Sequence, residues 1–107
     1  MEPPVQNVTV HDLAAAIERG EPVVDVRSPA EYAAGHVPGA VLVPMPSVPD
    51  RVEELRAHTP LYLICEVGSR SYRVGEFLAQ FGIETRNVSG GTAHWRELGW
   101  PLELGGA

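Results

Sequence analysis

The chain has 107 residues, of which 44% are hydrophobic and 21% are charged, and its formal net charge is −6. This length predicts one domain with one hydrophobic core. The single cysteine, Cys65, excludes an internal disulfide, a metal site built on several cysteines and a C-x-x-C redox pair. All eight basic residues are arginines scattered along the chain, so neither nucleic acid nor an anionic membrane surface is expected as a partner.

The apolar runs and the start of the chain bear on the cellular compartment of the protein, and its ends on the extent of the core. No apolar run approaches the roughly 18 residues that a membrane span needs. The start, Met1-Glu2-Pro3-Pro4, lacks the basic and apolar segments of a secretory signal, so we expect a cytoplasmic protein. Residues 1–6 and 105–107 are predicted to be loose termini around a core of about residues 8–102.

The first elements are marked by a helix-capping pattern and a short apolar run. Thr9, with Asp12 three residues later, resembles a capping box, and the apolar residues that follow have helical spacing as far as Ile17. Gly20 is expected to end this helix. Residues 23–26 then read as a short buried strand.

The middle of the chain repeats the alternation of helix and strand. Residues 28–31 (Ser-Pro-Ala-Glu) start a short helix, which Gly35 ends. Residues 40–43 form a candidate strand, and residues 48–57 a candidate helix. Residues 61–64 are apolar on both faces, which is typical of a parallel strand covered on both sides.

The last third places a polar loop directly after that strand. The loop runs from Cys65 to Arg70, and residues 74–81 have the i, i+3, i+4, i+7 spacing of a helix. A strand over 83–88, a break at the two glycines and a helix over 92–98 complete the series. This order predicts an α/β domain with a mostly parallel sheet, in which ligands bind beyond the carboxyl ends of the strands.

The Cys65 loop has the composition of an anion cradle. It leaves a strand and enters a helix, whose first N–H groups have no partner within the helix. Gly68 permits the positive φ that turns main-chain N–H groups inward, and Arg70 adds positive charge. These groups favour a thiolate, since lowering the pKa by roughly two units needs only about 2.7 kcal/mol. The alternative interpretation is a small buried apolar cysteine.

The sequence as a whole resembles the single-domain members of the rhodanese-like family. Four segments carry the resemblance over about Val8 to Leu102: Asp25-Val26-Arg27 with Glu31-Tyr32, then Gly35 to Ala40, then Cys65 to Ser71, and finally Gly90 to Trp95 with Gly99-Trp100-Pro101. They resemble the family's DVR…EY, GHIPGA, CxxGxRS and GGxxxW…GxP patterns, in order and with similar spacing.

The resemblance implies a mostly parallel five-stranded sheet flanked by helices on both faces, and a sulfurtransferase. Cys65 would take a sulfane sulfur from a small donor such as thiosulfate, or from a persulfide, and pass it to a thiol or protein acceptor. No metal and no organic cofactor is implied. The substrate-binding loop would be formed by Glu66, Val67, Gly68, Ser69 and Arg70.

Two other functions remain open from the sequence. Phosphatases and arsenate reductases of similar fold use a loop one residue longer than the four residues between Cys65 and Arg70, so they fit less well. Glu66 brings a negative charge beside the thiolate, which would raise the cysteine pKa and repel thiosulfate if the side chain points at the mouth of the loop, and would have a small effect if it points to solvent. This residue favours a weakly catalytic or non-catalytic interaction module, or a relay that accepts sulfur only from a protein persulfide.

The remaining polar residues are interpreted as scaffold. We expect Asp25 to bind loop main chain, and Arg27 to pair with Glu31 or another carboxylate. Ser71 is expected to cap the following helix. His36 is expected to hydrogen-bond loop carbonyls, and the histidines show no spacing of a zinc site. Arg73 either adds positive potential one turn after Arg70 or is a solvated arginine. A monomer is expected.

Overall fold

The computed structural model describes residues 4–58 and 60–106. Its centre is a single sheet in the order β1-β5-β4-β2-β3, and every neighbouring pair is parallel. The strands are β1 (Val5–Val8), β2 (Val23–Asp25), β3 (Val41–Leu42), β4 (Leu61–Ile64) and β5 (Thr85–Val88). The five-stranded α/β fold expected from the sequence is therefore confirmed.

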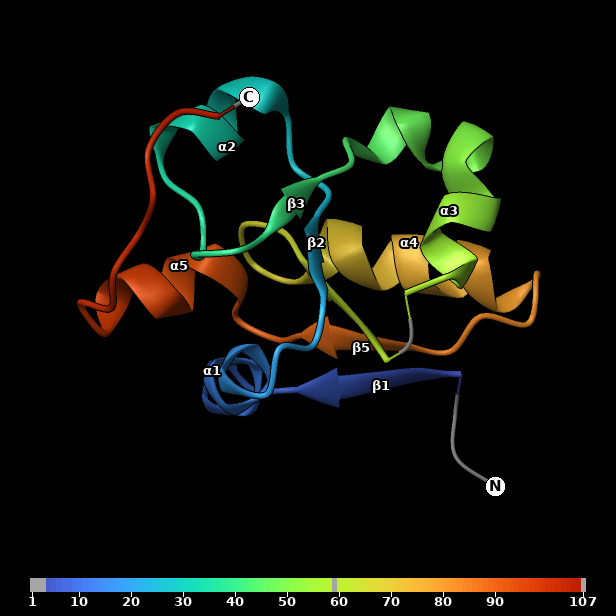
Figure 1. The fold of residues 1–107 in the computed structure, drawn as a ribbon, viewed down its shortest axis with the longest axis horizontal. Coiled ribbons are helices and arrows are strands. Elements are labelled where there is room, and N and C mark those ends of the chain that lie inside the picture. Colours follow the sequence, from blue (N-terminus) through green and yellow to red (C-terminus); the bar gives the residue numbers. More distant parts are fainter. Residues whose placement is uncertain (1–3, 59, 107) are drawn as a thin grey trace.

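Helices cover both faces of the sheet, as Figure 1 shows. They are α1 (Val10–Glu18), α2 (Pro29–Ala34), α3 (Val52–Arg56), α4 (Ser69–Ala79) and α5 (Gly91–Glu97), with a 3₁₀ segment η1 (Met45–Arg51) before α3. Side chains of the central strand β4 pack against the helices on both faces of the sheet. Leu61 and Leu63 pack with α3 and α4, whereas Tyr62 and Ile64 pack with α1 and α5. This explains why the strand is apolar throughout.

The predicted helix caps form, although several helices and strands begin or end at other residues than predicted. Thr9 with Asp12, and Ser28 with Glu31, make complete capping boxes. The predicted helix over 48–57 is instead η1 followed by α3, because Pro49 interrupts the regular α-helical hydrogen bonding. The predicted strands over 40–43 and 83–88 shorten to β3 and β5.

Both predicted loose termini were wrong in part. Val5 and Gln6 belong to β1, which pairs in parallel with β5 and so satisfies main-chain groups that would otherwise be unpaired at the sheet edge. At the other end, the Gly105 N–H donates to the Ala33 carbonyl at 2.8 Å, which ties the tail to α2. Residues 1–3 and 107 lie outside the described residues.

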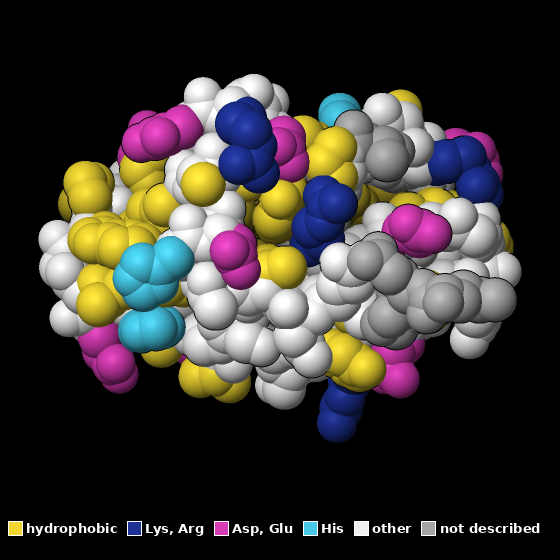
Figure 2. Space-filling model, turned by 90° about the horizontal axis from the view of Figure 1, so that it is seen from below, with side chains coloured by type: hydrophobic (Ala, Val, Ile, Leu, Met, Phe, Trp, Pro, Cys, Tyr) yellow, Lys and Arg dark blue, Asp and Glu magenta, His cyan; other side chains and the backbone are white. Residues whose placement is uncertain are grey.

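The arginines on one face of the molecule are dispersed. On the face seen in Figure 2, the arginines lie apart from one another and among carboxylates. That arrangement lacks the continuous basic stripe of a duplex-binding surface on this face. In the described part of the chain, no helix is both long enough and apolar enough to span a bilayer.

Candidate active site

The Cys65 loop joins the carboxyl end of β4 to the start of α4. Gly68 has a φ of +107°, in the left-handed region that favours glycine, and this turn directs the chain into α4 at Ser69. The loop is also held from α5, where the N–H of Thr92 donates to the Cys65 carbonyl at 2.9 Å. Gly91 allows this approach, because a Cβ there would lie 2.5 Å from the same carbonyl oxygen.

The sulfur of Cys65 is fully buried, and polar donors face it. The Gly68 N–H donates to Sγ at 3.1 Å, and the Ser71 hydroxyl lies 3.3 Å from Sγ. Burial raises the pKa of the thiol. The Ser71 hydroxyl and the main-chain N–H groups of Ser71, Gly68 and Val67 lower the pKa by more, so it lies below its ordinary value. The donors therefore stabilise the thiolate form of Cys65 more than burial destabilises it.

Ser71 was wrongly predicted to cap the helix. The N-cap position belongs to Gly68, so Ser71 lies inside the first turn, fully buried. Its Oγ is 2.5 Å from Asn87 Oδ1, and the Asn87 amide donates to the Gly68 carbonyl at 3.1 Å. The Asn87 amide also donates to Asn7 Oδ1 at 3.0 Å. Ser71 thus links the thiol to a polar chain across β5 and β1.

Asp25 and Arg27 form a buried ion pair beside the loop. Arg27 Nη2 lies 2.8 Å from Asp25 Oδ2, and the two side chains are 0–1% exposed. Arg27 also donates to the Gly35 carbonyl at 2.8 Å and to Glu66 Oε1 at 3.1 Å. Arg27 was expected to pair with Glu31 or with another carboxylate. In the described chain its partners are Asp25 and Glu66, and not Glu31. Asp25 binds the Arg27 main-chain N–H at 3.0 Å, as expected for loop support.

Arg70 was expected to add positive charge beside the thiol, but its side chain binds a carboxylate on α2. Its guanidinium makes two hydrogen bonds of 2.8 Å to the carboxylate of Glu31 on α2. This contact, helped by the cap at Ser28, lowers the pKa of Glu31 to about 2. Arg70 is half-buried at the first turn of α4, and its hydrogen bonds within the described chain go to Glu31 rather than to Sγ.

The sequence suggested that Glu66 places a negative charge beside the thiolate. In the structure its carboxylate is paired with two arginines. Glu66 Oε2 lies 2.8 Å from Arg96, and Oε1 lies 3.1 Å from Arg27. Arg96 chiefly, and then Arg27, hold the pKa of Glu66 below its ordinary value against the opposing effect of burial. The largest influences on the pKa of Cys65 are its burial and the donors of Ser71, Gly68 and Val67.

The chain was compared with known proteins. The family model of the rhodanese-like domain matches residues 9–98. The chain belongs to the rhodanese-like family. It is 36% identical over 81 residues to a sulfurtransferase of Allochromatium vinosum, covering 75% of this chain and 76% of that protein. It is 32% identical over 82 residues to the thiosulfate sulfurtransferase GlpE of Pseudomonas paraeruginosa, covering 76% and 74%.

Solved structures agree with this assignment. The rhodanese-like domain protein from Staphylococcus aureus superposes with a TM-score of 0.83 at 33% identity, over 94% of this chain and 99% of that one. The suspected family is confirmed, and the relatives place this rhodanese-like domain among sulfurtransferases.

The remaining predicted site residues contribute in different ways. Val67 and Ser69 expose their side chains, Val67 to 60%, so Val67 supports the thiol through its main chain. His36 is structural, as expected, with Nδ1 2.8 Å from the Tyr32 carbonyl oxygen and its ring stacked on that of Tyr32. Arg73 lies on α4 and lines a groove with Met45 and Phe77.

Sequence reasoning missed three residues that build the site of this rhodanese-like domain. Asn87 holds Ser71, Thr92 holds the Cys65 carbonyl, and Arg96 neutralises Glu66. Thr92 carried a usable signal, because it follows two glycines at the start of a predicted helix beyond a strand. Asn87 carried a weaker one, a polar residue in an otherwise buried strand.

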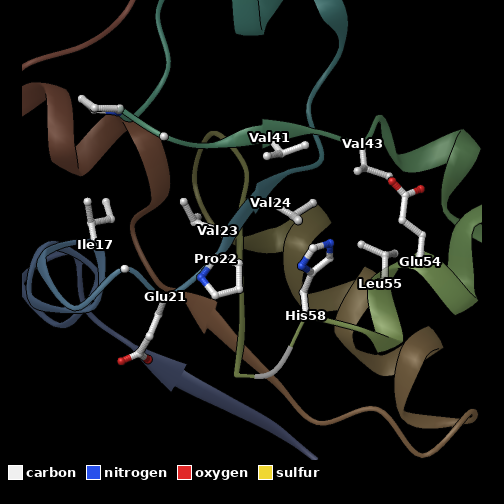
Figure 3. A pocket seen from close by; sticks show the side chains of 13 residues that line it. Ile17, Glu21, Pro22, Val23, Val24, Val41, Val43, Glu54, Leu55 and His58 are labelled. Atoms are coloured by element: carbon white, nitrogen blue, oxygen red, sulfur yellow. The ribbon is translucent and has the colours of Figure 1, made fainter.

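An apolar pocket of about 300 Å³ lies elsewhere, as Figure 3 shows. Its wall includes Ile17, Pro22, Val24, Val41 and His58. These residues surround the amino end of β2, whereas Cys65 follows the carboxyl end of β4. The pocket is therefore not part of the candidate active site of the rhodanese-like domain.

Proposed function

We propose that this protein transfers sulfane sulfur through a persulfide on Cys65, from thiosulfate or a persulfide donor to a nucleophilic acceptor. One observation carries the proposal. The Cys65 sulfur is buried against the Gly68 N–H and the Ser71 hydroxyl, and its pKa lies below the ordinary value. A buried apolar cysteine would have a raised pKa instead. The sulfurtransferases among the relatives support the same reaction class.

The reaction needs only the thiolate and the donor. With thiosulfate, the Cys65 thiolate attacks the outer sulfur, the bond between the two sulfur atoms of thiosulfate breaks, and sulfite leaves with the bonding electron pair. The new persulfide anion then gives its outer sulfur to an acceptor such as cyanide or a thiolate, and the Cys65 thiolate returns. The main-chain donors that favour the thiolate also suit the persulfide anion.

The burial of Sγ adds a step before the chemistry. Cys65 is 0% exposed, so a donor reaches the sulfur only after the loop or a covering side chain moves. Motions of this kind often gate enzymes whose sites are shielded from water. The same burial supports the second candidate, a relay that takes sulfur from a protein persulfide, because docking of a protein partner can open the loop.

Intact mass spectrometry tests the proposal directly. After incubation with thiosulfate or with a persulfide donor, we expect the protein to gain the mass of one sulfur atom and to release thiocyanate when cyanide is added. Cys65→Ala should do neither, and Ser89→Ala, at an exposed position after β5, should do both. Failure of the wild type with every donor would reject the proposal. Labelling by a protein persulfide alone would favour the relay.

A further inference from the structure

The arginines around the Cys65 loop are matched by carboxylates. Each arginine that lies in the loop or contacts it is bound to acidic partners: Arg27 to Asp25 and Glu66, Arg96 to Glu66, and Arg70 to Glu31. Three guanidinium groups thus face three carboxylates. The surroundings of the loop therefore carry no surplus positive charge from these side chains.

The next arginine along α4, Arg73, is not part of these ion pairs in the described chain. Arg73 lines a groove with Met45, Val48 and Phe77. Arg70 lines a different groove, with Ser28 and Pro44. Met45 lines both grooves, so the two adjoin at this residue.

This balance bears on the donor. A thiosulfate dianion entering the loop meets guanidinium groups whose charge is already offset by carboxylates, and Arg70 shares its charge with Glu31. An organic persulfide brings less charge to the loop than thiosulfate does, because its neutral form, R–S–SH, carries none at the sulfur to be transferred and its anion carries one. Given the sulfur transfer proposed above, we propose that Glu31 determines donor specificity. By holding Arg70, Glu31 favours an organic persulfide over dianionic thiosulfate.

The Arg70–Glu31 contact is placed where it can act on the donor. Both side chains are about one-third exposed, so the pair can exchange partners with a bound anion at moderate cost. Glu31 chiefly raises the pKa of Arg70, and the Cys65 thiolate adds to this increase. The guanidinium therefore lies within electrostatic range of the reacting sulfur, although Glu31 holds it.

The transfer from a persulfide balances without another reactant. The Cys65 thiolate attacks the terminal sulfur of R–S–SH, the S–S bond of the donor breaks, and R–S⁻ leaves with the electron pair. Cys65 then carries S–SH, and the proton stays on the transferred sulfur. No atom is oxidised or reduced overall, because one S–S bond replaces another.

Glu31→Gln tests the inference while keeping the fold. Glutamine can still accept the Ser28 N–H in the capping box, but it lacks the charge that holds Arg70. The matched control is Glu54→Gln, because Glu54 on α3 makes a similar pair with Arg51 at 2.7 and 2.8 Å, outside the loop. Rates of Cys65 persulfide formation are measured with thiosulfate and with glutathione persulfide.

We expect the wild type to react faster with glutathione persulfide than with thiosulfate. Glu31→Gln should raise the thiosulfate rate constant by about fivefold, the size of a released surface ion pair, and should change the glutathione persulfide rate less than about twofold. Glu54→Gln should change neither rate. Arg70→Gln, which leaves Glu31 unpaired, should lower the thiosulfate rate.

Three results would overturn the inference. They are a wild type that prefers thiosulfate, a Glu31→Gln variant whose thiosulfate rate is unchanged or lower, and an equal effect of Glu31→Gln on both donors. In each of these results sulfur transfer itself persists. A wild type inert to both donors would instead reject the function on which the inference rests.

Discussion

Two arginine–carboxylate pairs lie at the carboxyl end of the sheet, and they differ in environment more than in geometry. Arg27 and Asp25 are 1% and 0% exposed, whereas Arg70 and Glu31 are 36% and 34% exposed. Both arginines contact both oxygens of the carboxylate. Water can replace a partner in the outer pair but not in the inner one. The same chemistry therefore gives a fixed scaffold inside and an exchangeable contact outside.

The inner pair is tolerated because its hydrogen bonds are complete. Besides Asp25, the Arg27 guanidinium binds the Gly35 carbonyl and Glu66, which fixes α2 and the Cys65 loop to β2. A buried ion pair of this kind is no guarantee of stability, because desolvation offsets its attraction. Removing only one partner is nevertheless costly, since it leaves a charge buried without compensation.

Arg27→Met should have the largest effect of the variants considered. The change leaves the fully buried Asp25 carboxylate with the main-chain N–H of residue 27 as its remaining partner in the described chain. We expect the free energy of unfolding to fall by about 3–5 kcal/mol, measured by urea denaturation. Arg70→Met, the outer counterpart, should cost about 1 kcal/mol or less.

The double variant Asp25→Leu/Arg27→Met tests whether the cost of Arg27→Met comes from the unpaired Asp25 charge. Removing both charges should recover part of the loss, because no uncompensated charge remains. If Arg27→Met and Arg70→Met cost the same, the distinction between a scaffold pair and an exchangeable pair would be wrong.

Ser71→Ala should have an intermediate effect, on the thiol and on the Asn87 side chain that the same hydroxyl binds. The Ser71 hydroxyl lies 3.3 Å from Cys65 Sγ and shares its one proton between Sγ and Asn87 Oδ1, while Gly68 continues to donate from the main chain. Hydrogen bonds to a charged group contribute about 1.5–3 kcal/mol, which is about one to two pKa units. Because Asn87 shares the hydroxyl proton, we expect the Cys65 pKa to rise by about one unit, the lower end of this range. The rate of alkylation by iodoacetamide as a function of pH reports this pKa.

The exposed Ser89 provides the matched control, and Ser89→Ala should leave the Cys65 pKa unchanged. An unchanged pKa in Ser71→Ala would mean that the main-chain donors alone set the state of the thiol. A pKa that falls would contradict the role given to the hydroxyl.

The sequence carried the local and periodic features of this fold. Capping at Thr9 and Ser28, the apolar run of β4 and the glycine turn before α4 each act over a few residues, so they can be recognised without the tertiary structure. The edge strand β1 was missed because its pairing with β5 joins residues about 80 positions apart.

In the candidate site, too, the local features were predicted and the contacts between distant elements were missed. Cys65 and Gly68 were found because one loop holds both. The partners of Arg70, Ser71 and Glu66 were not found, because each comes from another element: α2, β5 and α5. Charge alone did not indicate which carboxylate each arginine would bind, and that choice decides whether Arg70 faces the thiol.

The smallest expected effect is a pH dependence of the outer pair. Glu31 has a pKa of about 2 in the folded protein, below the ordinary 4.5. Between these values the unfolded state binds more protons, so stability rises with pH. The contribution of the pair is therefore complete above about pH 4.5 and is lost as the pH falls towards 2. Because both side chains are partly exposed, it should not exceed about 1 kcal/mol.

Urea denaturation of the wild type and Glu31→Gln across this range isolates the contribution, because other carboxylates titrate equally in both proteins. The wild type should be the more stable at neutral pH, and the difference should vanish near pH 2. High salt should reduce the difference, since screening weakens an exposed pair. A difference that grows as the pH falls would contradict the lowered pKa of Glu31. A difference that salt leaves untouched would show that the outer pair behaves like Arg27 and Asp25. Arg70 would then not be free to exchange partners.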